Sequence, residues 1–272
     1  MPSNLSVVAL LAAQTFTVGI LPKGDPQDLK RAYANFGRYL ASQVGMPVDL
    51  QVPPTYSELL AGCAARKFHL VYLGGYLYIK AHAAGYELVA QSKDSASIRS
   101  TFITNSISDI RTLGDLKGKS FAFGDRQSTS GFLMPTYFLD INNLPPRAIF
   151  KSVVHTSNHE ETVRAVLDFK VDAGVVEERT LKRMAEKGKL QAGQIRVVWT
   201  TPPYPDNSWS MRADLDGRLK SRIVDAFMKP ERAAADRFAV YDYIIGNAFY
   251  RPRHEHFGRI RDAVLLEGLV VK

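Results

Sequence analysis

Strand-like and helix-like segments alternate in two successive runs along this 272-residue chain, and that alternation constrains its fold more than any other feature. The first run opens with the β-rich segment 15–21 and an amphipathic stretch that ends at Gly45. The second run extends from about residue 105 to about residue 201 and repeats the same order. Because strands connected through helices form mostly parallel sheets, we expect an α/β protein with two lobes.

A proline-rich segment, Pro202–Pro205, ends the second run and marks the place where the chain is expected to return to the first lobe. We therefore assign residues 15–104 and 206–272 to lobe I, and residues 105–205 to lobe II. The C-terminal part is expected to be mostly helical, including a helix over 230–249. Two lobes joined by two crossings leave a cleft between them, and hinge closure around a ligand in that cleft is the expected mechanism.

Three consecutive hydroxyl residues, Ser128, Thr129 and Ser130, stand between a buried-strand pattern at 120–123 and a stretch whose apolar residues recur at helical spacing. At such a junction the first backbone N–H groups of the helix lack intrahelical partners, and the helix dipole is positive. The hydroxyls add hydrogen-bond donors without adding charge, so the turn is suited to a small oxyanion. The alternative is that Ser128 or Ser130 only caps the helix.

Together with Phe121–Asp125, Gly131 and Pro135, these hydroxyl residues resemble the signature of phosphonate-type substrate-binding proteins of ABC importers. The resemblance extends over residues 15–212. Shorter matches to family motifs are Tyr56 with Leu59, Gly74–Tyr78, Asp115–Lys119, His159 and Val171–Gly174. The resemblance implies a bilobal type II periplasmic-binding-protein fold with a hinge and an interlobe ligand cleft. It also implies a small phosphorus oxyanion as ligand, an ABC transporter permease as partner, and export to the periplasm.

Five further residues complete the ligand-binding set that we expect. His159 opens a helix, where its ring can donate to an anion, most strongly as an imidazolium; the alternative is a surface or capping histidine. Tyr56 lies in the first turn of a helix that begins with a capping box, and its phenol either reaches the ligand or packs. Tyr78 occupies a family position, with packing as the alternative. Asp206 and Asn207 fall where some relatives hold the ammonium group of a ligand.

The chain departs from aminophosphonate-binding relatives at those ammonium positions. By spacing, one position falls on or near Arg179 and another at Asn207, while a family tyrosine is replaced by Ile98. With a cation and a neutral amide in place of two carboxylates, an ammonium loses its partners and meets repulsion. We therefore predict that phosphite, phosphate or methylphosphonate binds better than 2-aminoethylphosphonate. A register shifted by one residue would instead bring Asp206, and one residue of Glu177–Glu178, to the ammonium.

Composition and charge exclude several other classes. The net charge is +8, but Lys and Arg are scattered without aromatic interleaving, so we predict no nucleic-acid partner. The single cysteine, Cys63, excludes an intrachain disulfide, and the six histidines suggest no metal site. Nucleophile–base motifs and phosphate loops are missing, so we expect no catalytic residues, no cofactor and no enzyme activity. Apolar runs fall short of the roughly 18 residues that a membrane-spanning helix needs.

Residues 1–14 contain a short apolar run followed by small residues, as at the end of a secretory signal peptide, but no basic residue precedes the run. We interpret them as a truncated signal-peptide remnant, with a terminal strand as the alternative. The sequence thus predicts a monomeric, exported solute-binding protein that captures phosphite, phosphate or a small alkylphosphonate for an ABC importer. The alternatives are a periplasmic ligand-sensing module for a membrane signalling protein, and an enzyme on the same bilobal fold.

Overall fold

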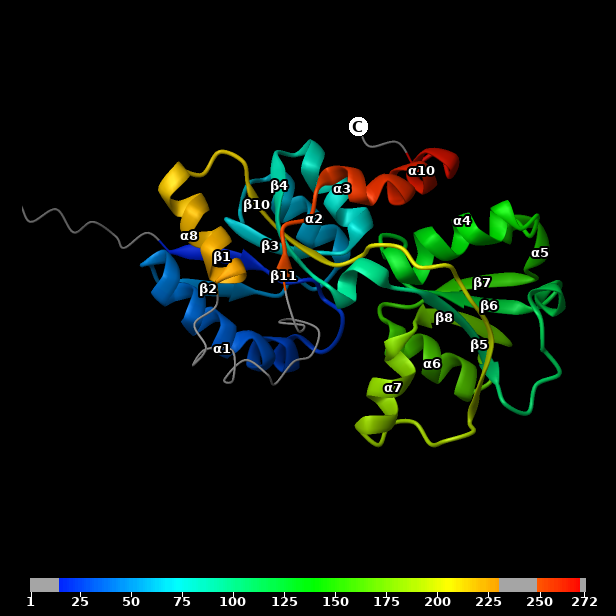
Figure 1. Ribbon diagram of the computed structural model, residues 1–272. Coiled ribbons are helices and arrows are strands. Elements are labelled where there is room, and N and C mark those ends of the chain that lie inside the picture. The colour runs from blue at the N-terminus through cyan, green and yellow to red at the C-terminus, as the bar shows by residue number, and fades with distance from the viewer. Residues whose placement is uncertain (1–14, 230–248, 270–272) are drawn as a thin grey trace, which may run out of the picture.

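Two β-sheets flanked by helices form the two lobes of the computed structural model, which describes residues 15–229 and 249–269 (Figure 1). The sheet of lobe I contains, in spatial order, β11 (Phe249–Tyr250), β4 (Tyr86–Ser92), β10 (Ser208–Arg212), β3 (Leu70–Leu73), β1 (Phe16–Gly19) and β2 (Val48–Gln51). The sheet of lobe II contains β7 (Ser152–His155), β6 (Ser120–Phe123), β8 (Ala173–Glu177), β5 (Ser100–Asn105) and β9 (Ile195–Thr200). Both sheets mix parallel and antiparallel pairs, which confirms the predicted α/β fold with two lobes.

Helices connect these strands in both lobes. In lobe I they are α1 (Pro26–Val44), α2 (Tyr56–Ala64), α3 (Gly75–Ala83), η1 (Asp94–Ser97), α8 (Gly217–Met228), η4 (His254–Phe257) and α10 (Gly258–Leu266). In lobe II they are η2 (Leu113–Leu116), the π-helical turn η3 (Thr129–Leu133), α4 (Met134–Ile141), α5 (Pro146–Ile149), α6 (His159–Leu167) and α7 (Arg179–Glu186). The strand–helix alternation expected from the sequence is therefore present in both lobes.

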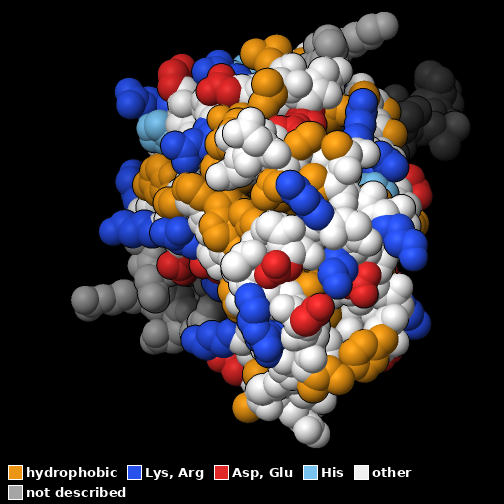
Figure 2. All heavy atoms as spheres, turned by 90° about the vertical axis from the view of Figure 1, so that its right-hand side faces the viewer, with side chains coloured by type: hydrophobic (Ala, Val, Ile, Leu, Met, Phe, Trp, Pro, Cys, Tyr) orange, Lys and Arg blue, Asp and Glu red, His pale blue; other side chains and the backbone are white. Residues whose placement is uncertain are grey.

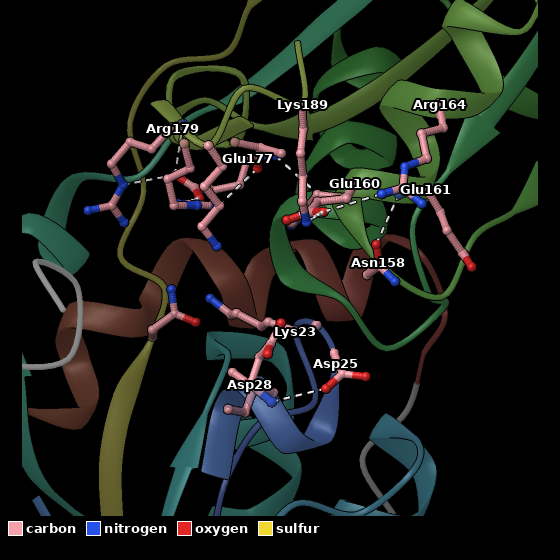
Figure 3. Close-up of a pocket in the computed structure, with 17 residues that line it drawn as sticks. Lys23, Asp25, Asp28, Asn158, Glu160, Glu161, Arg164, Glu177, Arg179 and Lys189 are labelled. Atoms are coloured by element: carbon pink, nitrogen blue, oxygen red, sulfur yellow. Dashed lines mark hydrogen bonds and ion pairs between the residues drawn. The ribbon is translucent and has the colours of Figure 1, made fainter. Parts of the chain in front are cut away.

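Helix α1 shows how local sequence fixes an element and its orientation. Asp25 caps it by accepting hydrogen bonds from two backbone N–H groups of the first turn, and Gly45 ends it at a φ of 72°, where glycine is favoured. The face buried against the sheet carries the apolar residues at the predicted helical spacing. This orientation leaves the loop before Asp25, at the carboxyl end of β1, facing the space between the lobes (Figure 3).

Two chain segments cross between the lobes and pair with each other. Ile98 and Tyr204 exchange backbone hydrogen bonds of 2.9 Å in each direction, and both side chains are buried. The strand β5, which follows Ile98, pairs with β8 and β9 over its whole length. We therefore propose that the first lobe boundary lies just before Ser100 rather than at residue 104, with the second boundary kept near residue 205.

The lobes are in close contact. Leu133, Met134 and Phe138 come from the turn and helix after β6, but they belong to the buried cluster of lobe I. Helix α10 packs on α3 of lobe I and also contacts α4 and η3 of lobe II. Figure 1 shows α10 above the junction of the two lobes. Burial of apolar side chains across the junction stabilises this closed arrangement.

The surface agrees with the scattered charge expected from the sequence. On the face shown in Figure 2, Lys and Arg side chains are spread among acidic and hydrophobic ones without a dense basic block. Within residues 15–229 and 249–269, no helix is both long enough and apolar enough to cross a membrane. The interpretation of residues 1–14, and nearly all of the helix expected over 230–249, lie outside the described residues.

Candidate functional site

The hydroxyl turn, Ser128–Gly131, occupies the junction between β6 and the helical segment η3–α4. Ser128 Oγ accepts a hydrogen bond of 3.0 Å from the backbone N–H of Gly131, so this serine does act as a cap. A Cβ on Gly131 would lie 2.9 Å from Ser128 Oγ, closer than packed atoms allow, and in a tight contact of 3.1 Å with the Cα of Gly124. Glycine is therefore needed here for the close approach of two backbone segments. All three hydroxyl side chains are buried.

Thr129 joins the hydroxyl turn to lobe I. Its Oγ1 accepts a hydrogen bond of 3.0 Å from the backbone N–H of Tyr76, in the first turn of α3, and donates to the carboxylate of Asp206. Asp206 Oδ1 in turn accepts a hydrogen bond of 2.8 Å from the backbone N–H of Gly75. A residue of lobe II and the return segment thus occupy the N-terminus of α3, whose own cap residue, Gly74, offers no side chain.

The sequence analysis named the N-terminus of α3 only as part of a family motif, Gly74–Tyr78, and did not assign its backbone N–H groups to the site. The signal was available, because Gly74-Gly75 follows the fully buried strand β3 and precedes a helix. This is the same strand–turn–helix pattern that drew attention to the hydroxyl turn. The structure places the two turns face to face, so backbone N–H groups and hydroxyls from both lobes converge on one place.

His159, the first residue of α6, lies beside the hydroxyl turn. Its Nε2 is 3.3 Å from Ser130 Oγ, and its Nδ1 accepts a hydrogen bond of 3.4 Å from the backbone N–H of Glu177. Burial lowers the pKa of His159 to about 4, and the nearby Glu177 carboxylate offsets only part of that effect. At neutral pH the ring is therefore neutral, with its Nε2–H directed at Ser130, so His159 would donate to an anion as a neutral imidazole.

The two expected tyrosines lie in different places. Tyr56, at the start of α2, is buried and hydrogen-bonded to the side chain of Ser128, so it joins the hydroxyl turn from lobe I. The hydroxyl of Tyr78 is instead 2.8 Å from Nδ1 of His254, and its ring packs on Phe257. The structure therefore brings Tyr56, but not Tyr78, together with the other expected ligand residues.

A cleft of about 290 Å³ lies between the lobes, and His159 is among the residues that line it (Figure 3). Asp25, Asp28 and the side chain of Lys23 line it from lobe I, and Glu177, Arg179 and the first part of α6 line it from lobe II. The remaining lining residues are Gly24, Leu29, Asn158, His159, Glu160, Glu161, Arg164, Thr180, Arg183, Lys187, Lys189 and Asn207. The lining is mostly charged or polar, unlike that of a pocket for an apolar ligand.

Glu177 ends β8 at the inner wall of this cleft, held between two arginines. Its Oε1 is 2.9 Å from Arg179 Nε, and its Oε2 is 2.9 Å from Arg183 Nη1. Burial alone would raise the pKa of Glu177, but the two guanidinium groups and Lys23 outweigh it and lower the pKa to about 2. The cation predicted at Arg179 is thus present, but it accompanies a carboxylate instead of replacing one.

Lys23 faces this wall from the loop after β1. Burial lowers the pKa of its ammonium to about 8, although Asp206 and Glu177 act in the opposite direction. Its Nζ lies 5.9 Å from the centre of the Tyr72 ring, and within residues 15–229 and 249–269 no carboxylate lies at ion-pair distance. Sequence reasoning missed Lys23 because a single lysine in a Pro–Gly turn is common; its place after a parallel strand was the available signal.

Comparison with known proteins decides the family. The sequence pattern of the ABC transporter, phosphonate, periplasmic substrate-binding protein family matches residues 18–252. The chain belongs to this family. This periplasmic substrate-binding family is the one that the sequence of the hydroxyl turn resembles.

Individual members of this substrate-binding family match over most of the chain. A probable ABC transporter phosphite-binding protein of Prochlorococcus marinus is 26% identical over 261 residues, covering 89% of this chain and 88% of the relative. The phosphonates-binding periplasmic protein of Escherichia coli is 28% identical over 218 residues, covering 77% and 64%. A solved structure of a Prochlorococcus marinus family member in complex with methylphosphonate superposes with a TM-score of 0.84, at 22% identity, covering 94% of this chain and 99% of that one. The structural match confirms the type II periplasmic-binding fold.

Proposed function

We propose that this substrate-binding protein captures a small phosphorus oxyanion, such as phosphite, phosphate or methylphosphonate, between its lobes. The observation that carries the proposal is the meeting of the hydroxyl turn with the N-terminus of α3 through Thr129 and Asp206. Hydroxyl groups of Ser128, Thr129 and Ser130, the phenol of Tyr56 and two backbone N–H groups can all donate to one oxyanion. Both lobes contribute, so binding would hold the lobes together.

Asp206 gives the proposed site a reason to prefer phosphorus oxyanions. Its carboxylate is buried, and burial raises its pKa, with Lys23 and the Gly75 N–H acting against the shift. A carboxylate only accepts hydrogen bonds, so an anion beside it must offer a proton. Singly protonated phosphate, phosphite and alkylphosphonates carry a P–OH group at neutral pH, whereas sulfate is fully ionised. We therefore expect the site to reject sulfate.

Titration calorimetry with methylphosphonate, phosphite, phosphate, sulfate and 2-aminoethylphosphonate tests this proposal. The amine-free phosphorus ligands should bind, with methylphosphonate tighter than 2-aminoethylphosphonate, and sulfate should give no heat of binding. The family member from Prochlorococcus marinus whose structure contains methylphosphonate supports this choice of probe. Binding of sulfate as tight as that of phosphate, or of 2-aminoethylphosphonate alone, would contradict the proposal.

Closure on the ligand is the mechanism that we propose for capture. The paired crossing segments at Ile98 and Tyr204 form a two-stranded hinge, because few other backbone hydrogen bonds link the lobes there. Small-angle scattering should show a larger radius of gyration without ligand than at saturation with methylphosphonate. Identical scattering curves at proven saturation would count against closure.

Delivery to an ABC importer, with a transporter permease as partner, completes the proposal. We further propose binding without turnover. His159 has a pKa of about 4, and its Nδ1 already accepts from the Glu177 N–H, so it is poorly suited to remove a proton from a nucleophile at neutral pH. Incubation of methylphosphonate with the protein, followed by phosphorus NMR, should return the ligand unchanged.

A further inference from the structure

The outer cleft, lined by Lys23, Asn207 and the Glu177–Arg179–Arg183 group, contains polar groups that the proposed oxyanion site does not use. Lys23 has no carboxylate at ion-pair distance among the described residues. Asn207 is buried, and its Oδ1 has no hydrogen-bond partner in the part of the chain that the structure describes. The amide of an asparagine can be turned by half a rotation, so Asn207 can offer its nitrogen as a donor to the cleft in place of this unpartnered oxygen.

The wall opposite Lys23 carries the Glu177 carboxylate, which is already paired and so does not favour a ligand cation. Both oxygens of Glu177 are taken by guanidinium groups, at 2.9 Å each. A ligand ammonium would have to displace Arg179 or Arg183 and would meet Lys23 across the cleft. Charges along the whole cleft nearly balance, with six cations and five carboxylates in its lining: Lys23, Arg164, Arg179, Arg183, Lys187 and Lys189 against Asp25, Asp28, Glu160, Glu161 and Glu177. What the cleft offers to a ligand anion is therefore Lys23, whose ammonium has no carboxylate at ion-pair distance among the described residues.

We propose that the outer cleft binds a carboxylate carried by the same ligand, and that the preferred ligands are small phosphonates with a carboxyl group. This inference rests on the proposed function, because it needs the phosphonate group to sit at the hydroxyl turn. Lys23 Nζ would donate to the carboxylate, and Asn207 would turn its amide nitrogen toward it. His159, whose Nε2 lies 3.3 Å from Ser130 Oγ, lines the cleft together with Lys23 and Asn207, so a short ligand that passes His159 would reach both groups.

The lack of a direct counter-ion also affects the protonation of Lys23. Its ammonium is partly desolvated without a direct counter-ion, which is the condition under which an added carboxylate contributes most. Binding of the carboxylate should therefore favour the protonated lysine. At pH 8.5 the ligand should bring a proton to the protein, seen as a dependence of the calorimetric enthalpy on the ionisation enthalpy of the buffer.

The test compares ligands that differ only at the far end. Phosphonoacetate and 3-phosphonopropionate are titrated beside methylphosphonate, ethylphosphonate and 2-aminoethylphosphonate, with wild type, Lys23→Met and Asn207→Ala. At least one carboxylate ligand should bind wild type about tenfold more tightly than ethylphosphonate, as expected for a charged hydrogen bond. Lys23→Met should abolish that preference and change methylphosphonate affinity by less than about threefold. Asn207→Ala should reduce it in part.

Lys170→Met is the matched control, because Lys170 is exposed on lobe II, 3.2 Å from Asp168, and its removal changes the net charge equally. This variant should keep the carboxylate preference. If methylphosphonate binds but neither carboxylate ligand exceeds ethylphosphonate, the inference is wrong and the proposed function stands. Equal losses for all ligands in Lys23→Met would also overturn it. If no phosphorus ligand binds wild type, both the proposed function and the inference are wrong.

Discussion

The hydroxyl turn and the outer cleft lie next to each other, but their polar groups are in opposite states. Each hydroxyl of the turn already has a protein partner: Gly131 N–H for Ser128, Tyr76 N–H for Thr129 and His159 for Ser130. The outer cleft holds full charges, and one of them, on Lys23, has no counter-ion at bonding distance among the described residues. A ligand at the turn exchanges existing hydrogen bonds for new ones, whereas a ligand in the outer cleft adds bonds that are missing.

This difference assigns different tasks to the two regions. At the turn, each new hydrogen bond to the anion replaces a bond within the protein, which reduces its net gain, so affinity there must come from several donors acting together. Addition of a bond to an uncompensated charge depends on the chemistry of the ligand, so selectivity among phosphonates should come from the outer cleft. Variants that act on one region alone can separate the two contributions.

The largest effect should come from Glu177, which balances the arginines of the outer cleft. Replacement Glu177→Gln leaves Arg179 and Arg183, whose side chains are 30% and 31% exposed, against a neutral amide and should lower the free energy of unfolding by about 3 kcal/mol at pH 7. The folded-state pKa of about 2 lies below that of an unfolded glutamate, so this contribution is present above pH 4.5 and is lost as pH falls toward 2. Urea unfolding at pH 7 and pH 3 should show the wild-type advantage shrinking at the lower pH.

The control for that prediction is Glu186→Gln on α7, the helix that carries Arg179 and Arg183. Glu186 is 60% exposed and lies 3.8 Å from Lys182, so its loss should cost less than about 1 kcal/mol. If Glu177→Gln were no more destabilising than this exposed change, the outer cleft would not hold a tightly balanced charge group.

The hydroxyl turn should give the next largest effect, on affinity rather than stability. Thr129→Val, and separately the Ser128→Ala/Ser130→Ala double variant, should weaken methylphosphonate binding roughly tenfold to a hundredfold, because hydrogen bonds to a charged group contribute about 1.5–3 kcal/mol each. Calorimetry measures the loss, and circular dichroism checks that the fold survives. The matched control is Thr136→Val in α4, since the buried Oγ1 of Thr136 has no hydrogen-bond partner among the described residues. Unchanged affinity in both turn variants would remove the turn from the site.

The sequence predicted the hydroxyl turn because its signal is local. Strand pattern, three hydroxyls, glycine and helix follow one another within a dozen residues, and the physics of a helix N-terminus does not depend on distant parts of the chain. The helix face of α1, its end at Gly45 and the alternation of the two lobes were predicted for the same reason, because they depend on periodicity and caps.

The outer cleft could not be predicted in this way. Lys23 and Glu177 are more than 150 residues apart in the chain, and only the closed fold brings them to one cleft. The neutral state of His159 and the pairing of Glu177 with Arg179 depend on burial, which a sequence does not report directly. Tyr78 matched a motif, yet the packing of α3 on η4 turns it toward His254.

The ammonium of Lys23 should lower the free energy of unfolding, unlike the hydrogen-bonded hydroxyls of the hydroxyl turn. Burial lowers its pKa to about 8, below that of an unfolded lysine, so the unfolded chain holds more protons between pH 8 and 10.5 and wild-type stability rises with pH across that window. Lys23→Met should therefore stabilise the ligand-free protein by about 1–2 kcal/mol at pH 7, a figure reduced for the partial exposure of the side chain. The gain should disappear near pH 10.5. Lys170→Met should show neither effect; an identical pH profile for both variants would contradict the unusual state of Lys23.

The smallest effect is expected at a contact between the lobes that lies outside the hydroxyl turn and the outer cleft, and it concerns the dependence of stability on pH. Glu267, just after α10, is hydrogen-bonded to Asp140 of α4, where the C-terminal helix of lobe I meets lobe II. Burial, the hydrogen bond and the charge of Asp140 together raise the pKa of Glu267 to about 7, with Arg147 acting in the opposite direction. Because this pKa lies above the unfolded value, the protonated pair contributes stability below pH 4.5 that is lost as pH rises through 7.

The variant Glu267→Gln keeps a hydrogen-bond donor at this contact but cannot ionise. The thermal midpoint of the variant should therefore change less between pH 5 and pH 8 than the midpoint of wild type. Glu267 is only partly buried, so the expected difference is about 1 kcal/mol or less, equivalent to about 2–4 °C in the midpoint. Asp140→Asn should reduce the pH dependence as well, since it removes the other carboxylate. Methylphosphonate affinity measured at pH 6 should be the same in wild type and Glu267→Gln, because neither the hydroxyl turn nor the outer cleft is altered. A midpoint in Glu267→Gln that falls with pH as steeply as in wild type would show that the carboxyl pair does not link the lobes.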